Sequence, residues 1–178
     1  SKAPLSPNQM RWDPIPFPDK PLNFIDSIVT FAGCGSPSSF IGASIHLFAT
    51  SASMDDQFFY NADGEMLIVL QEGKLCFETE FGPLNQQPGE IVTMPRGVKF
   101  QVNLASDHAR GYILENFGEM LHLPELGPIG ANGLANPRDF VYPSAKYTDQ
   151  AGDYKLVTKF QGSLWQTNMT HHPLDVVA

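Results

Sequence analysis

The stretch from Tyr60 to Val102 constrains the fold of this chain more than any other. Within it, turn residues such as Glu72-Gly73-Lys74 and Pro95-Arg96-Gly97 alternate with short apolar segments. Glycine and proline at this spacing interrupt helices, and short apolar runs bounded by turn residues are typical of strands. The pattern predicts a compact antiparallel β-unit with strands at Met66 to Leu70, Leu75 to Glu78, Ile91 to Met94 and Phe100 to Leu104.

Further strands are predicted on both sides of this unit. In Gly42 to Thr50, Ile45 and its neighbours at alternate positions share one face, and His46 and Phe48 lie on the other. Strict alternation of this kind indicates a half-buried strand. The remaining strand candidates are Met54 to Tyr60, Arg110 to Phe117, Tyr154 to Phe160 and Leu164 to Thr167.

One segment before this unit is ambiguous between helix and strand. Residues 23–31 place Phe24, Ile25 and Ile28 at helical spacing. Gly33, Gly35 and Pro37 follow, and residues of this kind are expected to end a helix.

Two segments are predicted to lie outside the sheets of a single β-domain at 23–178. Residues 1–22 form a proline-rich arm, which packs either on its own sheet edge or on a neighbouring domain or subunit. Residues 118–147 form an irregular, glycine-rich extension, in which Asn136-Pro137 predicts a helix start. We expect the part of this extension between Leu121 and Phe140 to pack against another domain or subunit.

The composition excludes several classes of protein. The chain has 178 residues, 42% of them hydrophobic, which suits one globular domain. Its net charge of −8, without clustered basic residues, argues against nucleic-acid binding. Neither a bilayer-spanning apolar run nor a secretory signal is recognisable. Cys34 and Cys76 are expected to be reduced thiols, which favours the cytoplasm. The first residue is not methionine, which is compatible with processing or with a longer parent protein.

A second pattern indicates the fold family. Gly89, Pro95, Gly97 and Phe100 have the spacing of the second sequence motif of cupins. The resemblance implies an all-β, cupin-like double-stranded β-helix or β-sandwich of the RmlC-like type. A cupin carries a metal-binding histidine where Phe100 stands, and the first-motif region 58–61 also lacks histidine, although Glu65 is near the motif's glutamate position. The sheet is therefore predicted to bind no metal.

No other pattern in the sequence indicates catalysis. Gly42-Ala43-Ser44 lacks the closing glycine of a nucleophile elbow, and Gly33-Cys34-Gly35-Ser36 is a flexible turn without a companion histidine nearby in sequence. The histidines are separated from one another or adjacent on a strand, and each is expected to be solvated or hydrogen-bonded rather than a ligand. They are His46, His108, His122, His171 and His172.

The loop from Gly127 to Phe140, GPIGANGLANPRDF, resembles the signature segment of the homogentisate 1,2-dioxygenase family. Other segments carry the same resemblance in order along the chain. They are 9–12, 59–64, 79–82, 110–115, 159–162 and 176–178.

The resemblance implies a role for the parent protein. Family members are Fe(II)-dependent oxygenases that open the ring of homogentisate with dioxygen to give 4-maleylacetoacetate, in tyrosine and phenylalanine catabolism. They assemble as hexamers built from two trimers. Their iron ligands, and a histidine that assists substrate deprotonation, lie in a second β-domain that follows the position of Ala178. None maps onto this chain, so no catalytic, cofactor-binding or metal residue is assigned here. The chain is expected to be a structural and oligomerisation scaffold, inactive alone.

Two alternatives remain open from the sequence. One is a stand-alone, metal-free cupin-like module that binds a small molecule in an open, polar-studded barrel mouth. The other is a metal-independent isomerase or sugar enzyme, which would need a buried pair such as His46 with Glu65 or Glu90. The scaffold hypothesis instead expects aromatic side chains to fill the sheet interior, namely Phe58, Tyr60 and Phe100.

Overall fold

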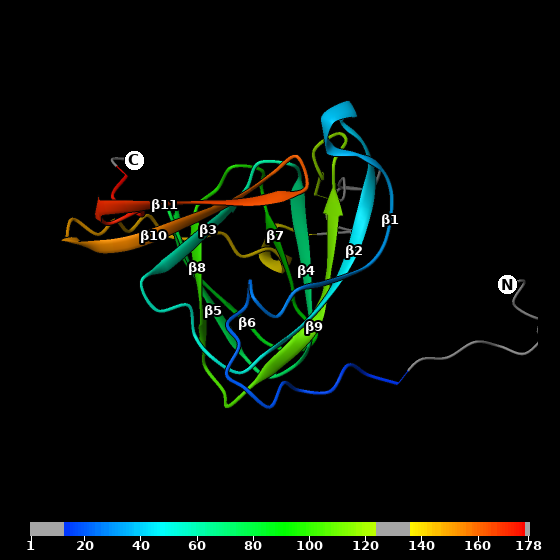
Figure 1. Cartoon of the computed structure of the whole chain (residues 1–178), viewed down its shortest axis with the longest axis horizontal. Coiled ribbons are helices and arrows are strands. Elements are labelled where there is room, and N and C mark those ends of the chain that lie inside the picture. Colours follow the sequence, from blue (N-terminus) through cyan, green and yellow to red (C-terminus); the bar gives the residue numbers. More distant parts are fainter. Residues whose placement is uncertain (1–12, 124–135, 177–178) are drawn as a thin grey trace, which may run out of the picture.

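The computed structural model describes residues 13–123 and 136–176, which form two facing β-sheets (Figure 1). Sheet A has the strand order β1-β2-β9-β4-β7, and sheet B has the order β11-β10-β3-β8-β5-β6. The strands are β1 Val29–Ser36, β2 Ile41–Thr50, β3 Gln57–Asn61, β4 Glu65–Glu72, β5 Leu75–Thr79, β6 Gly82–Gln86, β7 Ile91–Met94, β8 Phe100–Leu104, β9 Ala109–Asn116, β10 Ala151–Phe160 and β11 Ser163–His171. Two short 3-10 helices, η1 Pro37–Ser39 and η3 Pro137–Asp139, complete the regular structure of the described residues.

The predicted central unit is confirmed, and its winding defines the fold. β4 pairs with β7 in sheet A, whereas β5 pairs with β8 in sheet B. Between β4 and β9 the chain therefore crosses from one sheet to the other at every turn except the β5–β6 turn, which stays in sheet B. Gly73, between β4 and β5, has a φ of 90° that residues with a side chain rarely adopt. This repeated crossing between two sheets, which are antiparallel apart from the parallel β3–β10 pair, is the pattern of a double-stranded β-helix. The all-β, cupin-like prediction is therefore confirmed.

Two strands were not expected from the sequence. β6 was missed because Pro83 and Asn85 interrupt its apolar pattern, but it lies at the edge of sheet B, where proline is tolerated. β1 was missed because Gly33 and Gly35 were expected to end an element, whereas both lie inside the strand and pair with Ser44 and Gly42 of β2.

The helical spacing of residues 23–31 produces only a short turn. The amide of Ser27 donates to the carbonyl of Asn23 at 3.0 Å, and β1 begins at Val29. The helix does not continue because residues 29–36 pair with β2 instead, antiparallel and with one irregularity between Thr30 and Ala32. The turn nevertheless buries Phe24, which is fully inaccessible to solvent.

Aromatic side chains fill the space between the two sheets, but not all of the expected ones. Phe100 is fully buried and its ring centroid lies 5.6 Å from that of Phe59. Phe58 points the other way and packs in a separate small cluster with Tyr154 and Leu174, and Tyr60 is only partly buried. The prediction was correct for Phe100 and wrong for Phe58 and Tyr60, because successive strand residues face opposite sides and Phe59 takes the inward position.

The described part of the N-terminal arm packs on its own domain. The ring of Phe17 lies 4.2 Å from that of His108, and the guanidinium of Arg110 lies 5.0 Å from the Phe17 ring centroid. For residues 13–22, these contacts are with the start of β9, the central strand of sheet A, and not with an edge strand. Contact with another subunit stays a prediction, and so do the domain boundaries.

The extension at 118–147 is only partly described. Residues 124–135, which include most of the signature loop, lie outside the described residues. The predicted helix start at Asn136-Pro137 is confirmed as the single 3-10 turn η3. In the described part of the chain, no helix is long and apolar enough to cross a membrane.

Candidate functional site

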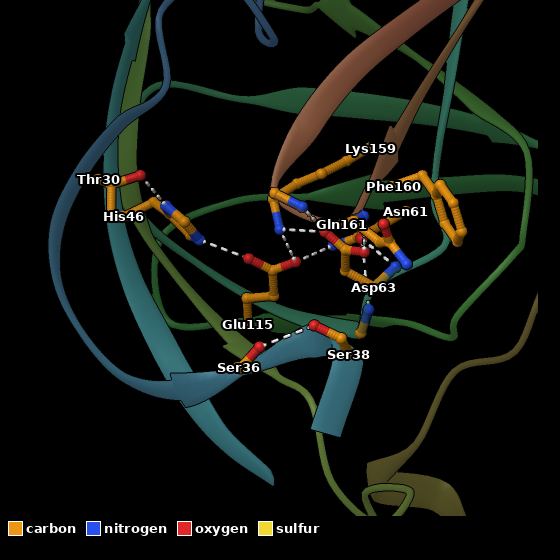
Figure 2. A network of polar contacts seen from close by, with 12 residues as sticks. Thr30, Ser36, Ser38, His46, Asn61, Asp63, Glu115, Lys159, Phe160 and Gln161 are labelled. Carbon is orange, nitrogen blue, oxygen red and sulfur yellow. Dashed lines mark hydrogen bonds and ion pairs between the residues drawn. The ribbon is translucent and has the colours of Figure 1, made fainter. Parts of the chain in front are cut away.

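Five polar side chains form a cluster between the sheets, called here the inner network (Figure 2). They are His46 from β2, Asn61 at the end of β3, Asp63 in the turn after β3, Glu115 from β9 and Lys159 near the end of β10. The network thus joins both sheets and the β10–β11 hairpin. It is the most concentrated group of buried ionisable side chains that the structure describes, and so it is the candidate site.

Glu115 is the centre of the network. Its side chain is 1% exposed, and His46 Nε2 lies 2.9 Å from Oε2. The other carboxylate oxygen, Oε1, accepts hydrogen bonds from Asn61 Nδ2 and Lys159 Nζ, both at 2.6 Å. A buried carboxylate with three donors meets the condition under which such a charge is tolerated in a protein interior.

Asp63 connects the network to the β10–β11 hairpin. Its carboxylate accepts from Lys159 Nζ at 2.9 Å and from the backbone amides of Gln161 and Gly162 at 2.5 and 2.8 Å. The hairpin turn is therefore held by one carboxylate, which also shares the ammonium group with Glu115.

The contacts of Glu115 also decide its charge. Burial is the largest single influence and by itself raises the pKa of Glu115. The hydrogen bonds from His46, Lys159 and Asn61, with the positive charge of Lys159, outweigh it, so the pKa lies below the ordinary 4.5. Glu115 is thus ionised at neutral pH, and an ionised carboxylate only accepts, so His46 Nε2 is the donor.

Thr30, beside the inner network, completes a series of hydroxyl, imidazole and carboxylate groups, an order that also occurs in catalytic sites. Thr30 Oγ1 lies 3.0 Å from His46 Nδ1, and His46 is oriented by Glu115. This order resembles that of a nucleophile, its base and an orienting acid. Nucleophilic catalysis also needs a cavity for substrate beside the hydroxyl, and two cavities in the described residues, one beside Asp55 and one beside Glu80, are lined by neither Thr30 nor His46. The geometry therefore fits a structural network better than a catalytic one.

The structure confirms that His46 is hydrogen-bonded, but with a carboxylate that the sequence did not single out. From the sequence it was alone in a strand, with Glu65 or Glu90 as conceivable partners. Its actual partner is Glu115, whereas Glu65 accepts from the backbone amide of Leu121 at 2.6 Å and Glu90 from that of Gln87 at 2.9 Å. The signal for Glu115 was present, because strand alternation puts it on the same face as the buried Ile113.

The other histidines do not gather into a site. His108 Nε2 lies 3.0 Å from Glu72 on the protein surface, and His122 and His171 are exposed. His172 packs against Phe58 with its ring 4.9 Å away, and burial lowers its pKa against the opposing effect of nearby aspartates. Over residues 13–123 and 136–176, no group of three or more histidine, cysteine or acidic residues could hold a metal ion.

These two cavities are among those that the described residues form, and both are shallow and open to the surface. One, of about 380 Å³, is lined by Asp55, Asp56, Asp153 and neighbours at the start of β3 and β10. The other, of about 420 Å³, lies between Glu80 and the segment around Tyr147. Neither enters the space between the sheets, where a cupin holds its metal.

These features define a cupin-like β-domain whose interior is filled rather than open. The chain belongs to the family described as homogentisate 1,2-dioxygenase N-terminal, whose model matches residues 1–178. This family assignment agrees with the resemblance found in the sequence.

Solved structures similar to this chain include small cupins, at low identity. A cupin-2 domain-containing protein from Shewanella frigidimarina is 20% identical, with a TM-score of 0.37, over 42% of this chain and 70% of its own. An RmlC-like cupin with a double-stranded β-helix fold from Methanocaldococcus jannaschii is 17% identical, with a TM-score of 0.41, over 50% and 77%. A conserved protein of unknown function from Streptococcus pyogenes is 12% identical, with a TM-score of 0.42, over 64% and 100%.

Proposed function

We propose that this chain is the N-terminal scaffold of a homogentisate 1,2-dioxygenase. The parent enzyme uses Fe(II) and dioxygen to open the ring of homogentisate to 4-maleylacetoacetate, in tyrosine and phenylalanine catabolism. Its iron is bound by residues beyond Ala178, and the enzyme is a cytoplasmic hexamer made of two trimers. The family match over residues 1–178 supports this proposal.

The observation that carries the scaffold role is the filling of the interior. Phe100 stands where the cupin motif has a metal-binding histidine, and it is fully buried against Phe59 and Phe77. Phenylalanine offers no lone pair to Fe(II), which in oxygenases prefers two histidines and a carboxylate. The described residues of this chain therefore do not fit the family's iron, and no step of the reaction is assigned to them.

What these residues supply is a rigid support. Aromatic packing fixes the distance between the sheets, and the inner network fixes the β10–β11 hairpin against both sheets. A catalytic domain placed against such a support keeps its ligands in position without contributions from this half.

Iron content is the direct test. The 178-residue chain is incubated anaerobically with equimolar Fe(II), desalted and measured by elemental mass spectrometry, beside the parent enzyme treated identically. We expect far less than one iron per chain for the 178 residues, and about one iron per subunit with homogentisate turnover for the parent. One tightly held iron per 178-residue chain, or a parent that holds iron but leaves homogentisate unchanged, would overturn the proposal.

The binding-module alternative requires an open, polar pocket between the sheets. The aromatic filling around Phe100 is the opposite of that requirement. The observations therefore favour the scaffold role over a stand-alone binding function.

A further inference from the structure

One aromatic side chain attaches the described part of the N-terminal arm to the domain. Within residues 13–21, Phe17 makes the only ring, ion-pair or hydrogen-bond contacts with other described residues. Its ring centroid lies 4.2 Å from that of His108 and 5.0 Å from the guanidinium carbon of Arg110. Figure 1 shows the arm, in dark blue, running past the start of β9. The position of this segment therefore depends on a single ring.

The arm joins the domain at Leu22, which is held independently of Phe17. The carbonyl of Leu22 accepts from the amides of Ser51 and Ala52 at 2.9 and 3.0 Å and from Thr50 Oγ1 at 2.9 Å. Its amide donates to Ser51 Oγ at 3.2 Å. These four bonds fix Leu22 to the end of β2. The arm can therefore leave β9 by turning about Leu22 without disturbing a sheet.

The ring of Phe17 lies on three polar side chains, Glu72, His108 and Arg110, called here the ring clamp. Glu72 and Arg110 are cross-strand partners on β4 and β9. Glu72 Oε2 lies 2.7 Å from a terminal guanidinium nitrogen of Arg110, and Glu72 Oε1 lies 3.0 Å from His108 Nε2. One carboxylate therefore orients both of the groups that contact the ring.

The charge of Glu72 supports this arrangement. The hydrogen bond with His108 is the main reason why the pKa of Glu72 lies below the ordinary 4.5, and the nearby positive charge of Arg110 lowers it further. Glu72 is thus ionised at neutral pH, so its two oxygens accept from His108 and Arg110. A neutral side chain at this position loses that hold on the two donors.

The backbone beneath the ring clamp is closely packed. A side chain at Gly73 would lie only 2.2 Å from the carbonyl oxygen of His108, so the turn after β4 lies directly against this backbone. Ser106 Oγ donates to the same carbonyl at 2.7 Å. The ring clamp is therefore a preformed surface, and the arm is the part that moves relative to it.

The ring clamp holds the arm weakly. The side chains of His108 and Glu72 are 42% and 43% exposed, and a cation–π contact at such a site favours the closed arm only about two- to fivefold. The four prolines at 14, 16, 18 and 21 reduce the entropy lost on closing, because each also restricts the open arm. One ring is thus enough to close the arm, and loss of one contact is enough to open it.

We propose that Phe17 and the ring clamp form a reversible latch. In the closed state the ring lies on Arg110 and His108, and in the open state residues 13–21 turn away about Leu22 and uncover the start of β9. Glu72 is a positioning residue, because it acts through His108 and Arg110. The uncovered clamp is a binding site for an aromatic side chain flanked by prolines, which is what the arm itself supplies.

Backbone order parameters from ¹⁵N relaxation of the 178-residue chain test the latch. The amides of residues 17, 19 and 20, between the ring and Leu22, should have values of about 0.8 in the wild type and below about 0.6 in Phe17→Ala. The amides of Ser51 and Ala52 should keep their wild-type hydrogen exchange, because Leu22 stays bound.

Two further substitutions separate recognition of a ring from burial of an apolar group. Phe17→Leu keeps an apolar side chain without a π face, so the order of the arm should fall most of the way to that of Phe17→Ala. Phe17→Trp should leave the arm at least as ordered as the wild type, because tryptophan is the best partner for a cation. A leucine variant as ordered as the wild type would overturn the role of the ring clamp.

Glu72→Gln tests the positioning role, because it keeps the size of the side chain but removes the charge that orients both donors. It should lower the order of the arm towards that of Phe17→Ala. Glu78→Gln is the matched control: it removes a carboxylate that pairs with Lys146 at 3.6 Å on β5, and it should leave the arm unchanged. If Glu72→Gln does not fold, Arg110→Lys gives the same test, because it keeps the charge without the planar guanidinium.

Circular dichroism confirms that each variant is folded. An arm that is already mobile in the wild type, or that stays ordered in Phe17→Ala or in folded Glu72→Gln, would overturn the latch. None of these measurements depends on iron, so failure of the latch and failure of the dioxygenase proposal are distinguishable.

Discussion

The space between the two sheets contains two regions, one packed by apolar aromatic side chains and the other joined by buried charged groups. Around Phe100, the ring centroids of Phe24, Phe59 and Phe77 lie 6.5, 5.6 and 6.0 Å away, and contact is entirely apolar. The inner network, in contrast, buries the charges of Glu115, Asp63 and Lys159. Asn61 belongs to the network yet follows Phe59 on the same face of β3, so the two regions adjoin.

The two regions differ in how a substitution affects the stability of the fold. The aromatic region is stabilised in proportion to the apolar area it removes from water, and the loss of one ring leaves a cavity. The network gains little net stability from its ion pairs, because desolvation offsets much of their attraction, but loss of a single partner leaves a buried charge. The first region supplies stability, and the second fixes where the β10–β11 hairpin lies.

The largest expected effect is in the aromatic region. Phe100→Ala removes a fully buried ring, and cavities of this kind cost about 3–5 kcal/mol of unfolding free energy. Urea unfolding followed by fluorescence measures it. Phe81→Ala is the control, since Phe81 is 53% exposed and its loss should cost about 1 kcal/mol or less. Equal losses for the two variants would show that the interior is not close-packed.

Glu115→Ala should destabilise the protein by a similar but smaller amount. It leaves Lys159 and His46 without their shared carboxylate, and we expect a loss of about 3 kcal/mol, the lower end for a broken buried pair, because Lys159 is partly reached by water. Urea unfolding again measures the effect. Glu78→Ala removes a carboxylate that pairs with Lys146 at the surface, and should cost less than about 1 kcal/mol. A Glu115→Ala loss no larger than the control would contradict the central role of Glu115.

The sequence predicts the aromatic region better than the network. Phe100 could be assigned to the interior because the cupin spacing fixes its position, and turn glycines such as Gly73 fix the strand boundaries around it. The network joins residues far apart in the chain, with 69 positions between His46 and Glu115 and 96 between Asp63 and Lys159. Local periodicity shows that Glu115 faces inward but not which side chain it meets, because the pairing depends on how the two sheets are placed.

Lys159→Met should destabilise the β10–β11 hairpin more than the rest of the fold. The substitution keeps the length of the side chain but removes the cation that joins Asp63 to Glu115, at a cost of about 1–3 kcal/mol. Hydrogen exchange should accelerate most at the amides of Gln161 and Gly162, which donate to Asp63. Lys155→Met, on the same strand but exposed, is the matched control and should leave these amides unchanged. Acceleration spread evenly over both sheets would show that Lys159 supports the global fold and not the hairpin alone.

The smallest effect concerns pH. The pKa of Glu115 is lowered on folding, so the native state binds a proton at this site less readily than the unfolded chain. Its contribution is therefore present above the ordinary pKa of 4.5 and is lost as the pH falls below that value through the lowered native pKa. The groups that face the carboxylate are His46, Lys159 and Asn61. Urea unfolding between pH 3 and 7 should show a shallower acid loss for Glu115→Gln than for the wild type, although the variant is less stable at pH 7. Parallel pH profiles would show that the acid sensitivity of the fold lies in other carboxylates, and that the network holds the hairpin by geometry rather than by charge.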